Sequence, residues 1–321
     1  MVIGKTKGVF MSDKIAVLMM AYGGPDSLDD VEAYYIGIRH GHKPSPQQLK
    51  LLKDRYAAIG GSSPLLGITK KQAQLLEEQL NAGLNGRRFD VYIGMKHWRP
   101  FIGEALDVIL GKDYEQLVTL PMAPYYSKMS VGAYDDIVKT ALQQKNAIID
   151  TVNIERYGAN PLFIKALADM VSSKLKAQPK DDEITIVFTA HSLPAKILGM
   201  DDPYTKELTQ TCELVAKFLG LKSWHLAYQS AGNTDDEWIG PTLLDTLARL
   251  KTENKKNFLL VPMGFISDNL EILYDIDIEC REFAKRNAIN VTRTDMLNYN
   301  HDFIYALAGI VKDAVARSGT D

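Results

Sequence analysis

The sequence has 321 residues, 46% of them hydrophobic, which is enough for a substantial core in one large domain or two ordinary ones. The formal net charge of −3 excludes a general positive field that would recruit nucleic acid or an acidic membrane surface. Its two cysteines, Cys212 and Cys280, form no C-x-x-C motif, and no apolar run approaches about 18 residues. The sequence therefore predicts a cytoplasmic protein without a disulfide framework, a cysteine-ligated cluster or a transmembrane helix.

Short runs of β-branched and apolar residues alternate with helical patterns along the whole chain. In the first half, strands are expected at residues 14–22, 88–95, 116–122 and 148–155, and helices at 28–38, 46–57, 67–82, 101–111 and 131–144. In the second half, strands are expected at 183–190, 224–229, 257–265 and 289–296, and helices at 161–177, 205–219, 241–253, 267–286 and 302–317. This alternation predicts two similar α/β lobes, each with a four-stranded parallel sheet flanked by helices.

The expected lobes divide the chain near its middle. The N-terminal lobe is predicted to span residues 13–124 and the second lobe residues 125–296, with the C-terminal helix, 297–321, packing back on the first lobe. Residues 1–12 carry no pattern of their own and are expected to form a flexible tail. Ligands of such sheets bind beyond the carboxyl ends of the strands, so we expect a binding cleft between the lobes.

Several predicted strands end in residues that suit such a cleft. Tyr22-Gly23-Gly24-Pro25 follows the first strand, residues 121–127 follow another, and His191 and Gly264-Phe265 end two more. Each motif alone is more commonly a turn or a packing element. Their shared location favours one common site.

His191 and an acidic helix give the strongest chemical signal. Glu271, Asp275, Glu279 and Glu282 recur every three or four residues in the helix predicted at 267–286. At about 100° per residue, these carboxylates fall within one sector of roughly 80°. Apolar side chains border that sector on both sides, which is unusual for a solvent-exposed face; they are Ile272, Ile276, Ile278 and Phe283.

Two interpretations of the acidic row remain open. A solvated helix face is the ordinary one, but apolar neighbours make the burial of like charges costly. The functional interpretation is a hydrated relay for metal ions or protons, because carboxylates suit hard cations and imidazole suits iron and zinc. Side chains four residues apart drift by about 40° around an α-helix, so a π-bulge, which is common at functional sites, would alter their alignment.

Sequence motifs of other enzyme classes give little support to a different activity. The sequence has no G-x-G-x-x-G at the first strand–helix turn, no phosphate-binding loop, no H-E-x-x-H and no G-x-S-x-G. The other five histidines are interpreted mainly as structural or surface residues. Among them His97, which follows a predicted strand, is the strongest candidate for a direct function.

Seven ordered motifs, from about residue 14 to the last helix, give the chain a family resemblance. They are Met20-Ala21-Tyr22-Gly23, residues 54–65, Tyr92–His97, Ala190–Pro194, Gln229–Asn233, Trp238–Pro241 and Leu270–Asp275. In these motifs the sequence resembles the ferrochelatases, in particular the coproporphyrin III ferrochelatases of Gram-positive bacteria. The resemblance implies two Rossmann-like lobes of the class II chelatase type.

The activity that this resemblance implies is insertion of ferrous iron into a porphyrin with release of two pyrrole protons. His191 and Glu271 match the family's catalytic pair at the metal-insertion site, and Asp275 and Glu279 would continue the path for metal or protons. A neutral imidazole can act as a base or as a ligand, so both roles stay open for His191. Iron and porphyrin are then substrates, and no redox cofactor is implied.

The resemblance also implies the substrate-binding residues. Tyr22 matches the tyrosine that approaches the metal from the opposite face of the macrocycle. Five further residues match positions that contact the substrate or its carboxylates: Arg39, Arg55, Tyr56, Ser63 and Tyr134. Guanidinium and hydroxyl groups suit the four propionates of coproporphyrin III. A surface ion pair is the alternative for the two arginines.

Two positions depart from the family pattern. Gly24 stands where threonine is expected, and Asn269 stands where histidine is usual, so a potential metal ligand or proton donor is lost and the metal preference stays open.

Coproporphyrin III giving coproheme is the favoured reaction; the alternatives are protoporphyrin IX giving protoheme and a non-catalytic tetrapyrrole- or metal-binding protein. We expect a monomer that passes coproheme to a downstream enzyme of heme synthesis and binds no nucleic acid.

Overall fold

A computed structural model describes residues 14–83, 86–178, 183–232 and 236–318, so the tail expected at residues 1–12 lies outside the described part. The strands form two four-stranded sheets with the orders β2-β1-β3-β4 and β6-β5-β7-β8, and every pairing is parallel. The strand bounds are β1 Lys14–Ala21, β2 Arg88–Met95, β3 Gln116–Pro121, β4 Asp150–Asn153, β5 Ile184–His191, β6 His225–Gln229, β7 Asn257–Val261 and β8 Asn290–Arg293. The predicted fold class is confirmed, and both sheets have the same strand order.

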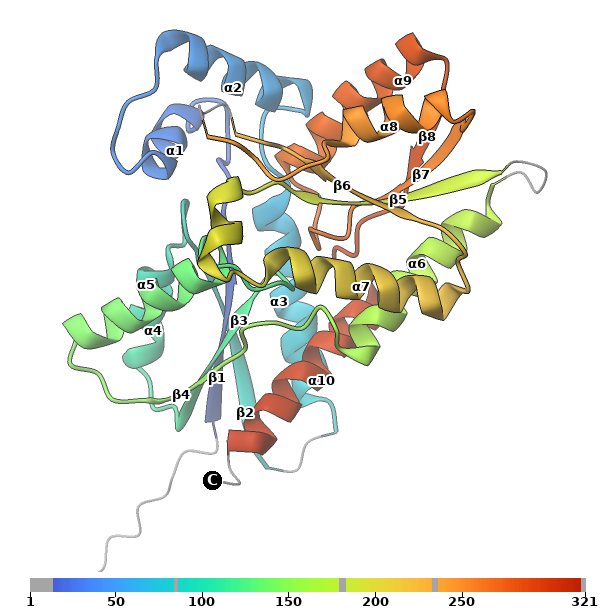
Figure 1. The fold of residues 1–321 in the computed structure, drawn as a ribbon. Coiled ribbons are helices and arrows are strands. Elements are labelled where there is room, and N and C mark those ends of the chain that lie inside the picture. The colour runs from blue at the N-terminus through green and yellow to red at the C-terminus, as the bar shows by residue number, and fades with distance from the viewer. Residues whose placement is uncertain (1–13, 84–85, 179–182, 233–235, 319–321) are drawn as a thin grey trace, which may run out of the picture.

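Helices cover both sheets (Figure 1). Their bounds are α1 Val31–Ile38, α2 Pro46–Ala58, α3 Leu65–Asn81, α4 Ile102–Leu110, α5 Val131–Gln144, α6 Pro161–Lys176, α7 Tyr204–Leu219, α8 Leu243–Thr252, α9 Arg281–Asn287 and α10 His301–Ser318. A 3-10 helix, η1, spans Ala195–Met200, and a π-helix, η2, spans Ile272–Cys280 and continues into α9. The expected strand at 257–265 ends earlier, at Val261, because Pro262 has no N–H for the ladder.

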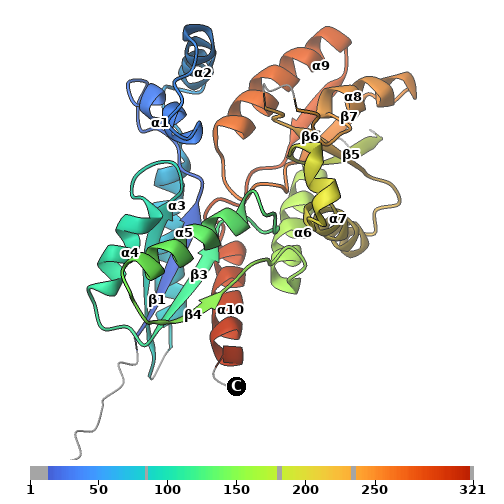
Figure 2. The same cartoon turned by 60° about the vertical axis from the view of Figure 1, so that its left-hand side comes forward.

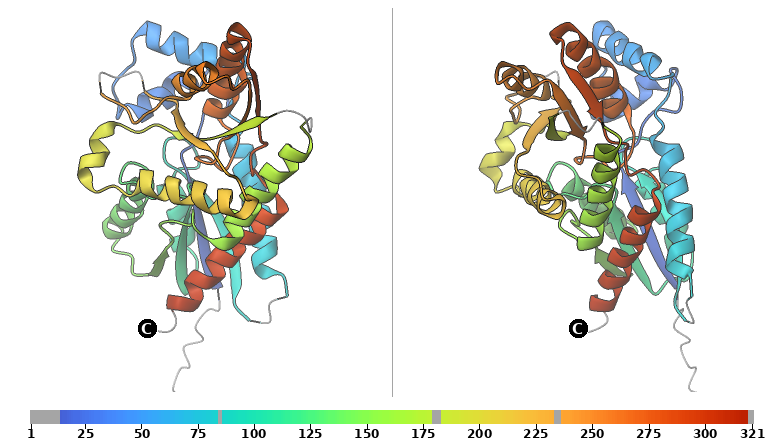
Figure 3. Two further views of the ribbon diagram at one scale, coloured as in Figure 1. Left: turned by 45° about the vertical axis from the view of Figure 1, so that its right-hand side comes forward. Right: turned by 90° about the vertical axis from the view of Figure 1, so that its right-hand side faces the viewer.

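The first sheet extends past the boundary that we expected between residues 124 and 125. Strand β4 pairs with β3, and α5 packs against α4, so both belong with the first sheet. Figure 2 shows the two lobes side by side, with α1 and α2 above the first sheet. In Figure 3, α10 lies beside the first lobe, where it contacts both α3 and α6.

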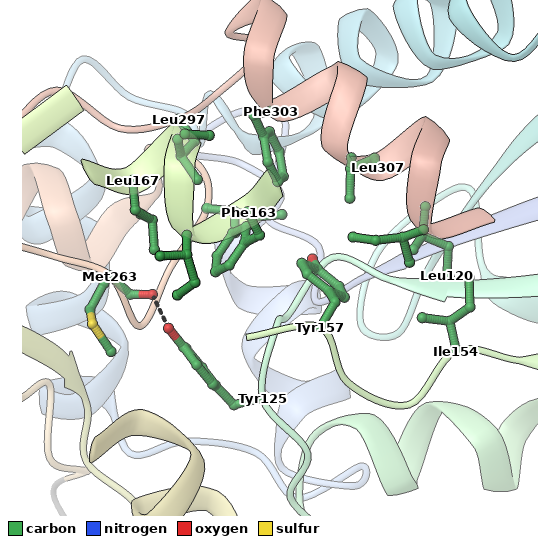
Figure 4. Packing of buried hydrophobic residues seen from close by; sticks show 14 of the residues in the cluster. Leu120, Tyr125, Ile154, Tyr157, Phe163, Leu167, Met263, Leu297, Phe303 and Leu307 are labelled. Atoms are coloured by element: carbon green, nitrogen blue, oxygen red, sulfur yellow. Dashed lines mark hydrogen bonds between the residues drawn. The ribbon is translucent and has the colours of Figure 1, made fainter. Parts of the chain in front are cut away.

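One hydrophobic cluster joins the two lobes. It includes Leu120 of β3, Phe163 of α6 and Phe303 of α10, all buried, together with residues of β5 and β7. The Tyr125 hydroxyl, in the loop after β3, donates a hydrogen bond of 3.2 Å to the carbonyl of Met263, in the loop after β7 (Figure 4). The carboxyl ends of the two sheets are thus held by a shared core.

Gly264 lies against the end of β5 at this shared core, and we expect its replacement to be strongly destabilising. Its N–H donates to the Thr189 carbonyl over 3.0 Å, and an added Cβ would lie only 2.5 Å from the Cα of Ala190. We expect Gly264→Ala to lower the free energy of unfolding by about 3 kcal/mol, because backbone must move to relieve the overlap. Urea unfolding measures this change. Gly103→Ala is the control, since a Cβ there meets nothing within 4 Å; equal midpoints for the two variants would contradict the prediction.

Candidate functional site

His191 is the last residue of β5, and its backbone and ring are held by three contacts. The Tyr204 hydroxyl donates to the His191 carbonyl over 2.9 Å, and the Phe265 ring packs edge-on against the imidazole at 5.9 Å between centroids. The ring nitrogen Nδ1 contacts the carbonyl oxygen of Ser192. A carbonyl only accepts, so in the neutral imidazole Nδ1 carries the proton and Nε2 keeps a free lone pair. That lone pair can accept a proton or bind a metal ion.

The acidic row lies on a helix that contains a long π segment. Glu271 immediately precedes η2, Asp275 lies within it, and Glu279 lies near its end. A π-helix closes its hydrogen bonds over five residues rather than four and therefore takes more than 3.6 residues per turn. Side chains four residues apart consequently stay closer to one line than in an α-helix. The sequence had indicated this possibility, and the structure confirms the π geometry.

The three carboxylates differ in burial along the helix. Glu271 is half-buried, Asp275 is 8% exposed, and Glu279 is exposed. Partial loss of water and the neighbouring Asp275 raise the pKa of Glu279 above its ordinary value. Bordering the row on the same helix, Ile272 and Ile276 are fully buried in the core of the second lobe. The row is therefore not an ordinary solvated face.

Asp275 is paired with a residue of the other lobe. Its carboxylate forms an ion pair with Arg55 from α2 and accepts a hydrogen bond from the Ser230 hydroxyl, which follows β6. The Arg55 guanidinium also lies over the Tyr274 ring, 4.6 Å from its centroid. In this structure Arg55 thus contacts the acidic row itself, and its Nε is buried without a hydrogen-bond partner.

The charge of Glu271 acts on tyrosines of the first lobe. Tyr22 directly follows β1, and loss of water around its phenol, with a smaller effect of the Glu271 charge, raises its pKa to about 12. Burial and then Glu271 also raise the pKa of Tyr56, which packs edge-on against Tyr34. The Glu271 carboxylate has no hydrogen bond or ion pair with any other described residue. An unpaired carboxylate among phenols is suited to receive a cation or a proton.

The other predicted substrate-binding residues come from the first lobe. Arg39 caps the end of α1, lies 5.7 Å from the Tyr35 ring centroid and has a buried Nε without a partner. Tyr134, on α5, is 4% exposed, and its burial, with a smaller effect of the Tyr22 hydroxyl, raises its pKa above the ordinary value. Ser63 is half-buried in the loop before α3.

The two departures from the family pattern have structural explanations. A Cβ at Gly24 would lie 2.6 Å from the Cβ of Ser63, so glycine lets the Ser63 loop approach the end of β1. Asn269 Oδ1 accepts the N–H of Ile272 over 3.0 Å and caps the start of the helix that carries Glu271. Asparagine therefore stabilises this helix end at the position where a ligand is lost.

Two residues near the site were not predicted in these roles. Ser230 lies in a motif of the resemblance, but nothing in the sequence indicated its bond to Asp275. His97 packs against Tyr22 with 4.5 Å between ring centroids. Burial, together with Lys96 and His40, lowers the pKa of His97 to about 4, so its ring is neutral near pH 7. The only indication of a role for His97 in the sequence was its position just after a predicted strand.

The residues predicted to handle metal do not gather into one cluster. Within the described residues, histidine, cysteine, aspartate and glutamate form no group of three or more that could hold a metal ion. The four residues predicted to handle metal are thus spread along the helix and the end of β5.

No helix of the described chain is long and apolar enough to cross a membrane.

Comparisons with known proteins agree on one family. The family model for ferrochelatase matches residues 14–315. A ferrochelatase of Herpetosiphon aurantiacus is 41% identical over 303 residues, covering 94% of this chain and 99% of the relative. Coproporphyrin III ferrochelatase 2 of Bacillus cereus is 40% identical over 304 residues, covering 94% and 95%. The coproporphyrin III ferrochelatase of Anoxybacillus flavithermus is 38% identical over 313 residues, covering 96% and 99%.

A solved structure shares the fold at low sequence identity. SirB from Bacillus subtilis with Fe3+ aligns with a TM-score of 0.61 and 13% identity over 96% of this chain and 98% of that one. This likeness supports the two-lobed architecture, and the family model and the relatives cover almost the whole chain. The chain belongs to the ferrochelatase family and is a metal-inserting enzyme.

Proposed function

We propose that the enzyme inserts ferrous iron into coproporphyrin III and releases Fe-coproporphyrin III, or coproheme, in heme biosynthesis. The observation that carries this proposal is the contact between the acidic row and the first lobe, where Asp275 forms an ion pair with Arg55. Relatives from Bacillus and Anoxybacillus that carry the coproporphyrin III name support the choice of substrate.

In the proposed reaction, iron replaces two pyrrole protons on the porphyrin nitrogens. A flat macrocycle keeps its nitrogen lone pairs in the ring plane, so binding energy from the rim is best used to bend the ring and expose one face. His191 would act from one face through Nε2, as base or as ligand, and Tyr22 from the other. The two protons, or the incoming iron, would pass along Glu271, Asp275 and Glu279.

Substrate carboxylates are proposed to bind at the first lobe. Arg39 and Arg55 each hold a buried Nε without a hydrogen-bond partner, and such a donor is stabilised by an anionic acceptor. Ser63, Tyr56 and Tyr134 complete the proposed contacts. Arg55 already pairs with Asp275, so a propionate would share or replace that carboxylate. The arginines favour a substrate with several propionates.

The substrate proposal predicts a clear preference in turnover. With anaerobic ferrous iron and each porphyrin in parallel, we expect kcat/KM for coproporphyrin III to exceed that for protoporphyrin IX by about tenfold or more, because each charge-assisted contact contributes roughly 1.5–3 kcal/mol. Porphyrin absorption follows the insertion. Equal or reversed values would favour protoporphyrin IX, an alternative that fits the Herpetosiphon relative, which is named only as a ferrochelatase.

We propose that the enzyme needs no redox cofactor, because metal insertion exchanges a cation for protons without electron transfer. We further propose a cytoplasmic monomer that passes coproheme to an enzyme that completes heme synthesis. Sedimentation of the purified protein with and without porphyrin measures the oligomeric state.

A further inference from the structure

Arg293 ties the π-helix to the second sheet from the side away from the acidic row. Arg293 is the last residue of β8, and its side chain is 14% exposed. Its guanidinium donates to both carboxylate oxygens of Asp277, over 2.9 and 2.7 Å. One nitrogen also reaches Asp268 at 3.1 Å. Asp268 precedes the helix and Asp277 lies inside η2, so one side chain spans most of this segment.

A second set of bonds fixes the near end of this bridge. Asn298 donates from Nδ2 to Asp268 over 2.7 Å, and its Oδ1 accepts the N–H of Asp268 over 2.9 Å. Arg293 also donates to the Thr294 carbonyl over 3.0 Å. Arg293 and Asp268 are therefore held by β8 and the following loop, and Asp277 is positioned relative to both.

A π segment of nine residues needs such support. Most π-helices are single turns, because their hydrogen-bond geometry is less favourable than that of an α-helix. Rewinding η2 as an α-helix would rotate Asp277 relative to Asp268 and break the bidentate contact. The planar fork of arginine is well suited to hold two carboxylates at a fixed separation, which a lysine ammonium does not do.

We infer that Arg293 is a positioning residue that holds η2 in its π winding and thereby keeps Glu271, Asp275 and Glu279 in one line. The inference rests on the proposed function of these carboxylates as the path for metal and protons. Arg293 itself contacts none of the three. Loss of Arg293 should therefore raise the KM for ferrous iron and leave the KM for porphyrin largely unchanged.

Three variants test this role in the full chain. Arg293→Gln removes the bridge, Arg293→Lys keeps the charge without the fork, and Arg281→Gln is the matched control. Arg281 pairs with the same Asp277 at 3.2 Å, but it lies on the helix itself and is 61% exposed in its side chain. For Arg293→Gln we expect the KM for ferrous iron to rise about tenfold or more, as is usual when a residue supporting metal ligands is lost. The KM for porphyrin should stay within about twofold of the wild type.

Hydrogen–deuterium exchange of the amides of residues 272–280 gives an independent measurement that requires no turnover. We expect faster exchange there in Arg293→Gln, an intermediate change in Arg293→Lys, and wild-type exchange in Arg281→Gln. Wild-type exchange and iron KM in Arg293→Gln would overturn the inference, and so would an equal rise of both KM values. If the wild type inserts no iron, the proposed function fails, whereas the exchange data still test whether Arg293 holds the π-helix.

Discussion

His191→Ala is expected to reduce iron insertion by about a thousandfold, the range typical for loss of a group that transfers a proton in the transition state. Nδ1 contacts the Ser192 carbonyl, so the reactive nitrogen is Nε2, and alanine offers neither a base nor a ligand there. Porphyrin binding should persist, because the proposed rim contacts come from the first lobe. Insertion is followed by porphyrin absorption, and affinity by quenching of porphyrin fluorescence.

His301→Ala is the control for this variant, since His301 opens α10 and its side chain is 85% exposed. It should match the wild type in both measurements. Loss of porphyrin affinity in His191→Ala with unchanged turnover at saturation would contradict the assignment. In that case His191 would bind the substrate rather than act on its nitrogens.

Glu271→Gln should reduce insertion by a hundredfold or more, on the order of the loss of one acid–base group. The substitution conserves the size of the side chain and removes the negative charge that raises the pKa of Tyr22 and of Tyr56. Iron should bind more weakly and protons should leave more slowly, so kcat and kcat/KM for iron both fall. Single-turnover insertion under anaerobic conditions, at varied iron concentration, separates the two effects.

Glu282→Gln is the matched control, because Glu282 lies on the same helix beyond the π segment and is exposed. It should leave insertion nearly unchanged. Equal losses in the two variants would show that total negative charge, rather than the position of Glu271, controls insertion. The path along the helix would then lose its support.

The sequence predicted the layers of the fold because burial on both faces of parallel sheets leaves a clear apolar alternation. It predicted one helix at 267–286 and named a π-bulge only as a possible change of alignment, whereas the structure has a π segment of nine residues. It placed the lobe boundary too early, because β4 is a short strand whose pairing with β3 depends on a long-range contact. Strand pairing is set by tertiary structure, and the local pattern carries little information about it.

The partners of Asp275 could not be predicted for the same reason. Arg55 is 220 residues away in the sequence, and a salt bridge at that distance leaves no periodic pattern. Asn269 was interpreted only as the loss of a ligand, and its bond to the N–H of Ile272 was not predicted. Such a cap depends on the orientation of one side chain, which the sequence does not show.

The position of α10 has a consequence for protein synthesis. Phe303, Leu307 and Val311 of this helix complete the cluster that also buries Leu76 and Leu80 of α3. The ribosome makes α3 long before α10, so the nascent first lobe leaves that apolar face uncovered while the whole second lobe is being translated. Exposed apolar surface of this kind promotes aggregation and recruits chaperones. The enzyme is therefore expected to reach its native state only after translation of α10, and to depend on chaperones until then.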